Sequence, residues 1–174
     1  MHKFEISTDS TSDFYDSEIK QYNLYVGKLD FIMTDKNGKI TERKDDFKNT
    51  QEYIDFYNDL SNGIVAKTSI LNLQAHIDLF RKMAKNGIKN AIHISQGMGL
   101  SPTVINARKA IEEVKLEFPD INYVAIDSNT TTVQEGNLIR IAMKLRDNGK
   151  SMQETVDLLE KFKMQTQHFI VVDD

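Results

Sequence analysis

The feature that most constrains this fold is a repeated order of short apolar run, hydroxyl-rich loop and helical pattern. It is clearest at residues 91–103, where an apolar run stops at Ser95, two glycines follow, and a helical pattern begins after Pro102. Apolar runs that alternate with helical patterns predict an α/β fold, a mainly parallel sheet with helices on both faces. The chain contains no repeat, low-complexity tract or linker, so we expect residues 1–174 to form a single α/β domain.

The other elements are predicted from periodicity and from helix start and stop signals. Strands are expected near residues 4–6, 24–33 (with a break near Gly27), 64–66, 88–94, 122–126 and 168–172. Helices are expected near residues 13–22, 50–62, 73–86, 102–118, 133–147 and 151–164. Ser151 and Glu154 have the spacing of a capping box at the start of the last helix. A turn signal at residues 35–38 precedes a polar strand at 39–43, which predicts a small hairpin at the edge of the sheet.

Composition excludes several classes of protein. The formal charge of -4 and the pI near 5.6 argue against nucleic acid as a partner, because such domains are usually basic. No run approaches the roughly 18 apolar residues of a transmembrane helix, so we expect no transmembrane segment. The absence of cysteine excludes disulfides and thiolate chemistry, and fits a cytoplasmic location.

Four hydroxyl-rich loops follow predicted strands, at residues 7–13, 67–69, 95–101 and 127–132. The carboxyl ends of parallel strands meet at one edge of a sheet, so we expect all four loops to converge there. Hydroxyl and backbone N–H donors suit an anion or a carbonyl oxygen, whereas few groups are available for proton transfer. The alternative is structural, because the same residue types are favoured in loops and at helix N-caps without any ligand.

Motifs of known enzymes mostly fail. Gly97 and Gly99 begin a dinucleotide-binding fingerprint, but Pro102 occupies the third glycine position, and neither a phosphate-binding loop nor a nucleophile elbow is present. His93 lies within an apolar strand and is expected to be a hydrogen-bonded core histidine. No cofactor and no metal site are predicted.

Four motifs together resemble the DegV family, in order and in spacing, over essentially the whole chain. They are Thr8-Asp9-Ser10-Thr11-Ser12-Asp13, Lys67-Thr68-Ser69, the segment from Ile94-Ser95 to Leu100-Ser101-Pro102-Thr103, and Ile126-Asp127-Ser128. The resemblance implies the fold of a DegV N-terminal domain that binds a long-chain fatty acid rather than catalysing a reaction. It also implies presentation of the acyl carboxylate to a separate fatty-acid kinase.

The resemblance further implies that Thr68 and the Ser95/Gln96 pair hold the carboxylate. Gln96 stands where the family has a second serine, and Pro102 where it has glycine. The loops and the resemblance together give a candidate ligand site of Asp9, Ser10, Thr11, Thr68, Ser69, Ser95, Gln96, Gly97, Ser101 and Ser128. Family members continue into a second lipid-binding domain that completes the acyl-chain pocket, and we expect that domain to be missing here.

Two other functions stay open. The chain could be a small α/β enzyme that acts on a phosphorylated or carboxylated metabolite, with Asp9 and Asp127 near a metal ion. It could instead be a protein-interaction module whose sheet edge docks a kinase subunit.

Overall fold

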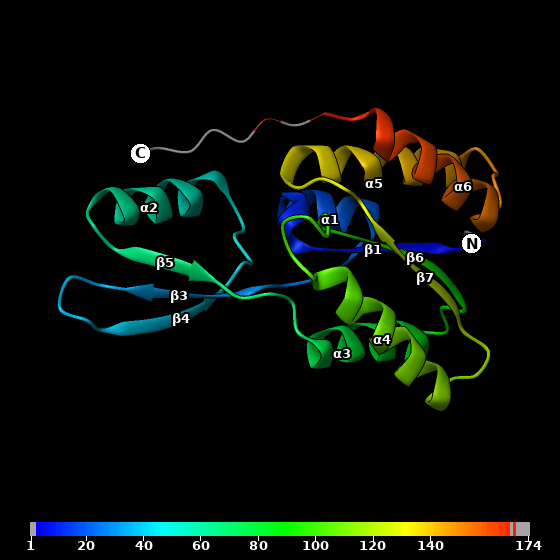
Figure 1. The fold of residues 1–174 in the computed structure, drawn as a ribbon, viewed down its shortest axis with the longest axis horizontal. Coiled ribbons are helices and arrows are strands. Elements are labelled where there is room, and N and C mark those ends of the chain that lie inside the picture. Colours follow the sequence, from blue (N-terminus) through cyan, green and yellow to red (C-terminus); the bar gives the residue numbers. More distant parts are fainter. Residues whose placement is uncertain (1–2, 168, 170–174) are drawn as a thin grey trace.

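The computed structural model describes residues 3–167 and 169, and arranges them as two sheets with flanking helices (Figure 1). The strands are β1 (Glu5–Asp9), β2 (Tyr25–Gly27), β3 (Asp30–Thr34), β4 (Ile40–Lys44), β5 (Val65–Thr68), β6 (Asn90–Ser95) and β7 (Asn122–Asp127). The α-helices are α1 (Asp16–Tyr22), α2 (Thr50–Ser61), α3 (Leu73–Lys85), α4 (Thr103–Glu117), α5 (Thr132–Asp147) and α6 (Met152–Phe162). Short 3₁₀ helices are η1 (Ser10–Ser12) and η2 (Lys163–Gln165).

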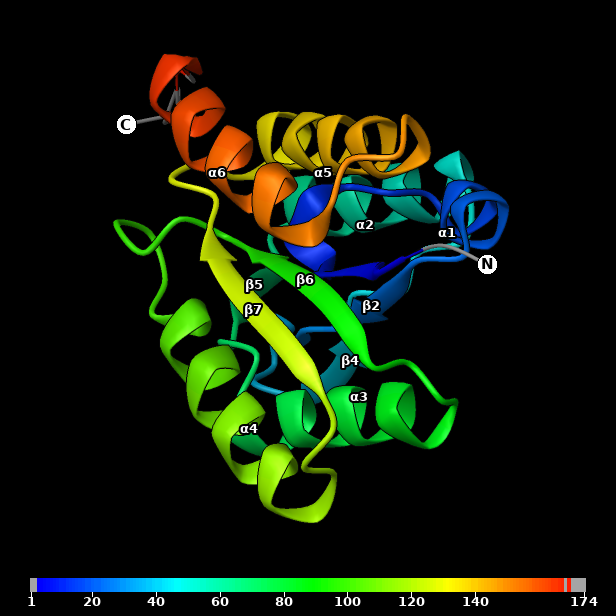
Figure 2. The same ribbon diagram turned by 90° about the vertical axis from the view of Figure 1, so that its right-hand side faces the viewer.

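The larger sheet is parallel and has the strand order β2-β1-β6-β7. Ser7 of β1 is paired with His93 of β6, and Ser95 at the end of β6 with Asp127 at the end of β7. Figure 2 shows α1, α5 and α6 on one face of this sheet and α3 and α4 on the other. The predicted parallel sheet with helices on both faces is therefore confirmed.

Two apolar clusters hold these layers together. One joins β1 and β6 to α5 and α6, with Ile92, Ile139 and Leu159 fully buried. The other joins the opposite face to α3 and α4, with Phe80 and Val104 fully buried. Burying one such side chain contributes about 1.5–3 kcal/mol. The two clusters therefore hold the helices firmly against both faces of the parallel sheet.

The hairpin predicted around the turn at residues 35–38 is present, but it does not border the parallel sheet. It forms a second, antiparallel sheet with the order β4-β3-β5, and α2 covers one face of that sheet (Figure 1). Phe31, Met33 and Phe47 form its core, against which Phe56 of α2 packs. At the predicted turn, Gly38 adopts a positive φ of 80°, a conformation that glycine adopts without strain.

The strand predicted at residues 24–33 has the predicted break near Gly27, and its two halves belong to different sheets. It becomes β2 and β3, and the chain passes from one sheet to the other after Gly27. A Cβ atom at Gly27 would lie 2.4 Å from Leu71 Cδ2, so a larger residue would require the buried Leu71 side chain to move. Which sheet each half joins depends on pairing between segments distant in sequence, and local periodicity does not report such pairing.

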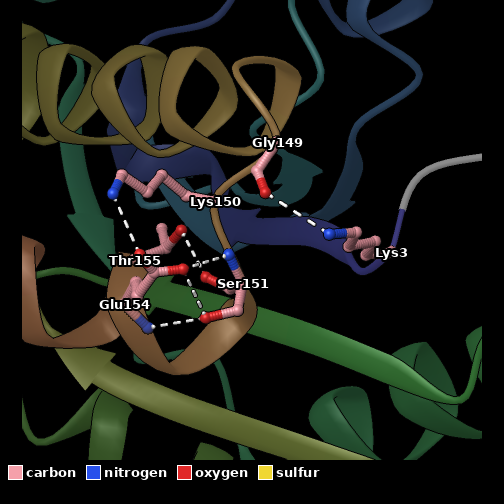
Figure 3. Close-up of polar contacts among 6 residues, drawn as sticks. All are labelled: Lys3, Gly149, Lys150, Ser151, Glu154 and Thr155. Carbon is pink, nitrogen blue, oxygen red and sulfur yellow. Dashed lines mark hydrogen bonds and ion pairs between the residues drawn. The ribbon is translucent and has the colours of Figure 1, made fainter.

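The N-terminus of α6 has the predicted capping box (Figure 3). The Glu154 backbone N–H donates to the Ser151 Oγ at 3.2 Å, and the Ser151 backbone N–H donates to the Glu154 carboxylate at 2.9 Å. Lys3 reaches the preceding turn and donates to the Gly149 carbonyl at 3.4 Å. The two bonds of the capping box satisfy backbone N–H groups at the start of α6 that would otherwise lack partners.

Among the described residues, no helix is both long and apolar enough to cross a membrane. The strand predicted at residues 168–172 lies, apart from residue 169, outside the described part of the chain.

Candidate functional site

Three of the four hydroxyl-rich loops meet at the carboxyl edge of the parallel sheet. The Gln96 N–H donates to Asp9 Oδ2 at 3.2 Å, which joins the loop after β6 to the loop after β1. The Gly97 N–H donates to the Thr130 carbonyl at 2.7 Å, which joins the β6 loop to the β7 loop. The predicted convergence is therefore confirmed for these three loops.

Gly97 is the residue that allows the β6 and β7 loops to approach this closely. A Cβ atom at this position would lie 2.7 Å from the Thr130 nitrogen and 2.8 Å from the Asn129 carbonyl carbon. Both atoms belong to the backbone and cannot rotate away, so only glycine fits. Gly97 is thus part of the scaffold of the candidate site.

The fourth predicted loop has a different origin. Residues 67 and 68 belong to β5, which lies in the antiparallel sheet, so the reason given for its convergence with the other loops is wrong. The arrow of β5 in Figure 1 nevertheless points toward the parallel sheet. Asn106 of α4 also donates to the Leu71 carbonyl at 3.1 Å, which places the segment after Ser69 beside the first turn of α4.

Asp9 is the acceptor on which the loop donors converge. It is fully buried, and it receives the backbone N–H groups of Thr11 at 3.1 Å and Gln96 at 3.2 Å. Burial raises the pKa of Asp9 from 3.8, although each of these hydrogen bonds acts in the opposite direction. Several donors expected to face a ligand are thus turned toward a carboxyl group of the protein itself.

A second buried acid, Glu135 of α5, lies beneath the same loops and was not among the predicted site residues. Its oxygens lie 3.2 Å from the Thr8 hydroxyl and 2.8 Å from the Thr11 hydroxyl. Burial, followed by the nearby charge of Asp9, raises the pKa of Glu135 well above 4.5. A signal was present in the sequence, because Glu135 precedes the buried Leu138 and Ile139 at helical spacing and so lies on the apolar face of its helix.

His93 lies directly beneath the β6 loop and is hydrogen-bonded on both ring nitrogens, as expected for a core histidine. Its Nδ1 atom is 3.0 Å from Ser7 Oγ, and its Nε2 atom is 3.0 Å from Ser95 Oγ. Burial lowers the pKa of His93 well below 6.5, and the neighbouring His76 lowers it further. The imidazole ring is therefore neutral in the folded protein.

The predicted residues differ in whether a ligand can reach them. Thr68 and Ser69 are exposed, whereas Gln96 and Thr11 are half-buried. Ser69 donates to the Asp30 carbonyl at 2.8 Å, and Gln96 Nε2 donates to Thr131 Oγ1 at 3.0 Å. The buried members of the predicted set are Asp9, Ser10, Ser95, Gly97, Ser101 and Ser128.

Three of the buried serines form hydrogen bonds with other groups of the protein near the loops. Ser10 Oγ accepts the Leu29 N–H at 3.1 Å, which ties η1 to the crossing between the two sheets. Ser128 donates to the Thr130 carbonyl at 3.0 Å, inside its own loop. Ser101 Oγ lies 2.7 Å from Thr103 Oγ1 at the start of α4. In the described structure these hydroxyl groups face protein atoms rather than the surface.

A cleft of about 600 Å³ opens beside η1, between α1, α2 and α5. Its lining combines aromatic, apolar and charged side chains, which are Ser12, Asp13, Tyr15, Glu18, Tyr53, Tyr57, Val133 and Arg140. Burial and the charge of Asp45 raise the pKa of Asp13 to about 6. Arg140 is held by Glu18 at 2.7 Å and packs over the Phe14 ring. A cleft of this volume is within the usual range for small-molecule sites.

The pairing of Asp9 with Asp127 as metal ligands receives no geometric support. Asp127 Oδ1 accepts the backbone N–H groups of Met98 at 3.1 Å and Asn129 at 2.8 Å. Within residues 3–167 and 169, no group of three or more histidine, aspartate or glutamate side chains is placed to hold a metal ion.

Comparison with known proteins identifies the family. A family model described as "Uncharacterised protein, DegV family" matches residues 3–174. The chain belongs to the DegV family. A DegV domain-containing protein of Clostridium perfringens is 30% identical over 173 residues, which cover 99% of this chain and 57% of the relative. This DegV chain thus spans a little over half the length of that curated relative.

Solved structures of other DegV proteins share the fold. A DegV lipid binding protein from Thermotoga maritima matches with a TM-score of 0.76 at 21% identity, over 93% of this chain and 54% of that one. A fatty acid (stearic acid)-binding protein from Eubacterium ventriosum matches with a TM-score of 0.74 at 20% identity, over 90% of this chain and 52% of that one. DegV proteins with this α/β fold therefore include proteins that bind fatty acids.

Proposed function

We propose that this DegV chain binds a long-chain fatty acid and holds the carboxylate at the edge where the β1, β6 and β7 loops meet. The observation that carries this proposal is the accessible side-chain amide of Gln96 at that edge, in a fold shared with fatty-acid-binding proteins. Hydroxyl and amide donors suit a carboxylate, because hydrogen bonds to a charged acceptor are about twice as strong as neutral ones.

Accessibility favours Thr68 and Gln96 as the residues that contact the head group. Thr68 is exposed and Gln96 is half-buried, whereas Ser95 is covered. The contact with Thr131 uses one of the two N–H groups of the Gln96 amide. Gln96 can therefore donate to a ligand from the position where the family has a serine, with Ser95 supporting it from beneath.

The acyl chain would supply most of the affinity. Fourteen buried methylenes at roughly 0.8 kcal/mol each give about 11 kcal/mol, against an association cost of about 4–15 kcal/mol. Each hydrogen bond to the head group adds about 1.5–3 kcal/mol and mainly fixes which end of the ligand faces the loops. A carboxylate held at this edge would be available to a fatty-acid kinase subunit, which is the partner we propose for this site.

Mass spectrometry under native and then denaturing conditions tests the binding directly. We expect a long-chain acid to be released from the protein, and Thr68→Ala or Gln96→Ala to weaken its retention at least about tenfold, as loss of a charged hydrogen bond predicts. Thr41→Ala is the matched control, since Thr41 is an exposed hydroxyl in the same small sheet as Thr68. Absence of bound lipid together with no binding on titration would contradict the proposal.

Docking of a kinase subunit needs a separate measurement. If presentation of the acyl carboxylate is the function, acyl phosphate formation by an added fatty-acid kinase should fall in Thr68→Ala and Gln96→Ala. A complex that forms equally well with both variants and without any lipid would instead support a protein-interaction module.

A further inference from the structure

The cleft of about 600 Å³ beside η1 is lined by three tyrosine side chains. It lies where α2, which covers the smaller sheet, stands beside α1 and α5 of the parallel-sheet layer (Figure 1). Tyr53 and Tyr57 are four residues apart on α2, so their side chains lie on the same face of that helix. Tyr15, the N-cap residue of α1, contributes the third ring. The aromatic lining therefore comes from both layers of the protein.

The rings offer faces and edges to the space between them. Tyr15 and Tyr53 meet at 88° with ring centroids 5.9 Å apart, so they form two walls at a right angle. Tyr53 also packs against the Phe47 ring, at a centroid distance of 4.5 Å, which holds it in place. Tyr57 and Val133 are both 62% exposed. Exposed apolar side chains that gather around a cleft are typical of a binding site.

Arg140, the basic residue among the described residues of this lining, is already engaged. Its guanidinium lies 2.7 Å from Glu18 Oε1 and packs over the Phe14 ring at 4.4 Å. Gly136, one turn earlier in α5, leaves room for it, because a Cβ atom there would lie 3.1 Å from Arg140 Nη1. The other oxygen of Glu18 accepts the Tyr15 backbone N–H at 3.2 Å. Arg140 and Glu18 therefore neutralise each other, which disfavours an anionic ligand.

Asp13 adds a negative charge to the cleft that no basic side chain balances. The residue is exposed at the cleft, and within the described part of the chain no lysine, arginine or histidine forms an ion pair with it. Asp13 ends η1 in the left-handed conformation, with a φ of 55°, and its N–H donates to the Ser10 carbonyl at 3.4 Å. The cleft therefore combines three aromatic rings with one uncompensated carboxyl group.

We propose that this cleft binds a small organic cation of the quaternary ammonium class, such as a choline group, among the tyrosine rings and beside Asp13. The face of an aromatic ring attracts a cation, and quaternary ammonium groups are commonly recognised by sets of such rings. A quaternary group has no N–H to donate, which suits a cleft where both oxygens of Glu18 are occupied. No residue of this lining belongs to the candidate fatty-acid site, so the inference is independent of fatty-acid binding.

Calorimetric titration with choline and with neohexyl alcohol measures the contribution of the positive charge. The alcohol has the shape of choline, with a neutral tert-butyl group in place of the trimethylammonium group. Titration at about pH 8 keeps Asp13 ionised, because burial and the charge of Asp45 raise its pKa only to about 6. We expect choline to bind at least about tenfold more tightly than the alcohol.

Substitutions test which groups produce this preference. Asp13→Asn retains a residue that adopts the left-handed conformation readily, and it should lower the ratio of choline to alcohol affinity at least about fivefold. Tyr57→Leu should lower the ratio to a similar extent, whereas Tyr57→Phe keeps the ring and should leave it within about twofold of the wild type. Asp55→Asn is the control, because it removes a negative charge from an exposed position of α2 outside the cleft.

Three results would overturn the proposal: no saturable binding of choline, equal affinity for choline and the alcohol, or a ratio that both Asp13→Asn and Tyr57→Leu leave unchanged. Vesicle sedimentation distinguishes the sources of the cation. Wild-type protein that sediments with phosphatidylcholine but not phosphatidylglycerol vesicles, and that Asp13→Asn releases, assigns the cleft to a lipid head group. Saturation by free choline without sedimentation assigns it to a soluble cation.

Discussion

Replacement of Glu135 by glutamine tests whether the acid beneath the loops is protonated in the folded protein. The Thr11 hydroxyl contacts both Glu135 Oε2, at 2.8 Å, and Asp9 Oδ1. One hydroxyl proton cannot be donated to two carboxylates at once, so one of the two acids has to supply a proton of its own. Asp9 accepts two backbone N–H groups, whereas Glu135 faces hydroxyls, which places the proton on Glu135.

The raised pKa of Glu135 sets the sign of the pH dependence. In the unfolded chain this carboxyl group loses its proton near its ordinary pKa of 4.5, whereas burial and the charge of Asp9 keep it protonated to a higher pH in the folded state. Between 4.5 and the folded pKa, the folded state binds more protons, so its free energy of unfolding falls as the pH rises. One proton corresponds to about 1.4 kcal/mol per pH unit in this window.

Glutamine is uncharged at every pH and retains a donor and an acceptor for Thr8 and Thr11. We expect Glu135→Gln to match the wild type at about pH 4 and to become more stable than it by about 1.4 kcal/mol for each pH unit above 4.5, until the folded pKa is reached. Urea denaturation at a series of pH values measures the difference. Glu112→Gln, on the exposed surface of α4, is the control. Parallel curves for Glu135→Gln and the wild type would refute the protonated carboxyl group.

Two further substitutions test the scaffold of the site and of the last helix. Gly97→Ala should lower the free energy of unfolding by about 1–3 kcal/mol, because the added Cβ would lie 2.7 Å from the backbone nitrogen of Thr130. Gly99→Ala has no heavy atom within 4 Å of its added Cβ and should change stability little, so equal effects at both glycines would contradict the steric argument. Ser151→Ala should cost about 0.5–2 kcal/mol in thermal or urea unfolding through loss of the α6 cap. Ser17→Ala, in an exposed position of α1, should not reproduce that loss.

The parallel sheet could be predicted because its signals are local. The apolar run that ends at Ser95, the two glycines and Pro102 mark strand, loop and helix start within a few residues, and β6 and α4 form there. The antiparallel sheet depends on pairing between segments about thirty residues apart, such as Met33 with Ala66. Residues 64–68 look alike in either sheet, so their placement could not be read from periodicity.

The meeting of three polar loops could be predicted from the sequence, but the exposure and the contacts of their side chains could not. Residue type predicted polar loops at the carboxyl edge, yet it does not say which hydroxyls are buried. Ser95 and Gln96 are neighbours in sequence, whereas the structure covers the first and leaves the second half-exposed. Glu135 lies in α5, outside the loop motifs. Its place beneath the loops is known only from its contacts with Thr8 and Thr11.

The two buried acids also bear on the charge that an incoming carboxylate would meet. Asp9 lies directly beneath the Gln96 backbone, so an anionic head group at Gln96 would be repelled by a charged Asp9 and, if it were ionised, by Glu135. Repulsion between two charges grows steeply where water is excluded. A proton on Glu135 leaves one negative charge beneath the loop instead of two, and the N–H donors of Thr11 and Gln96 screen that one. Loss of the Glu135 proton lowers stability as the pH rises, and it would also make the proposed head-group site less tolerant of a carboxylate.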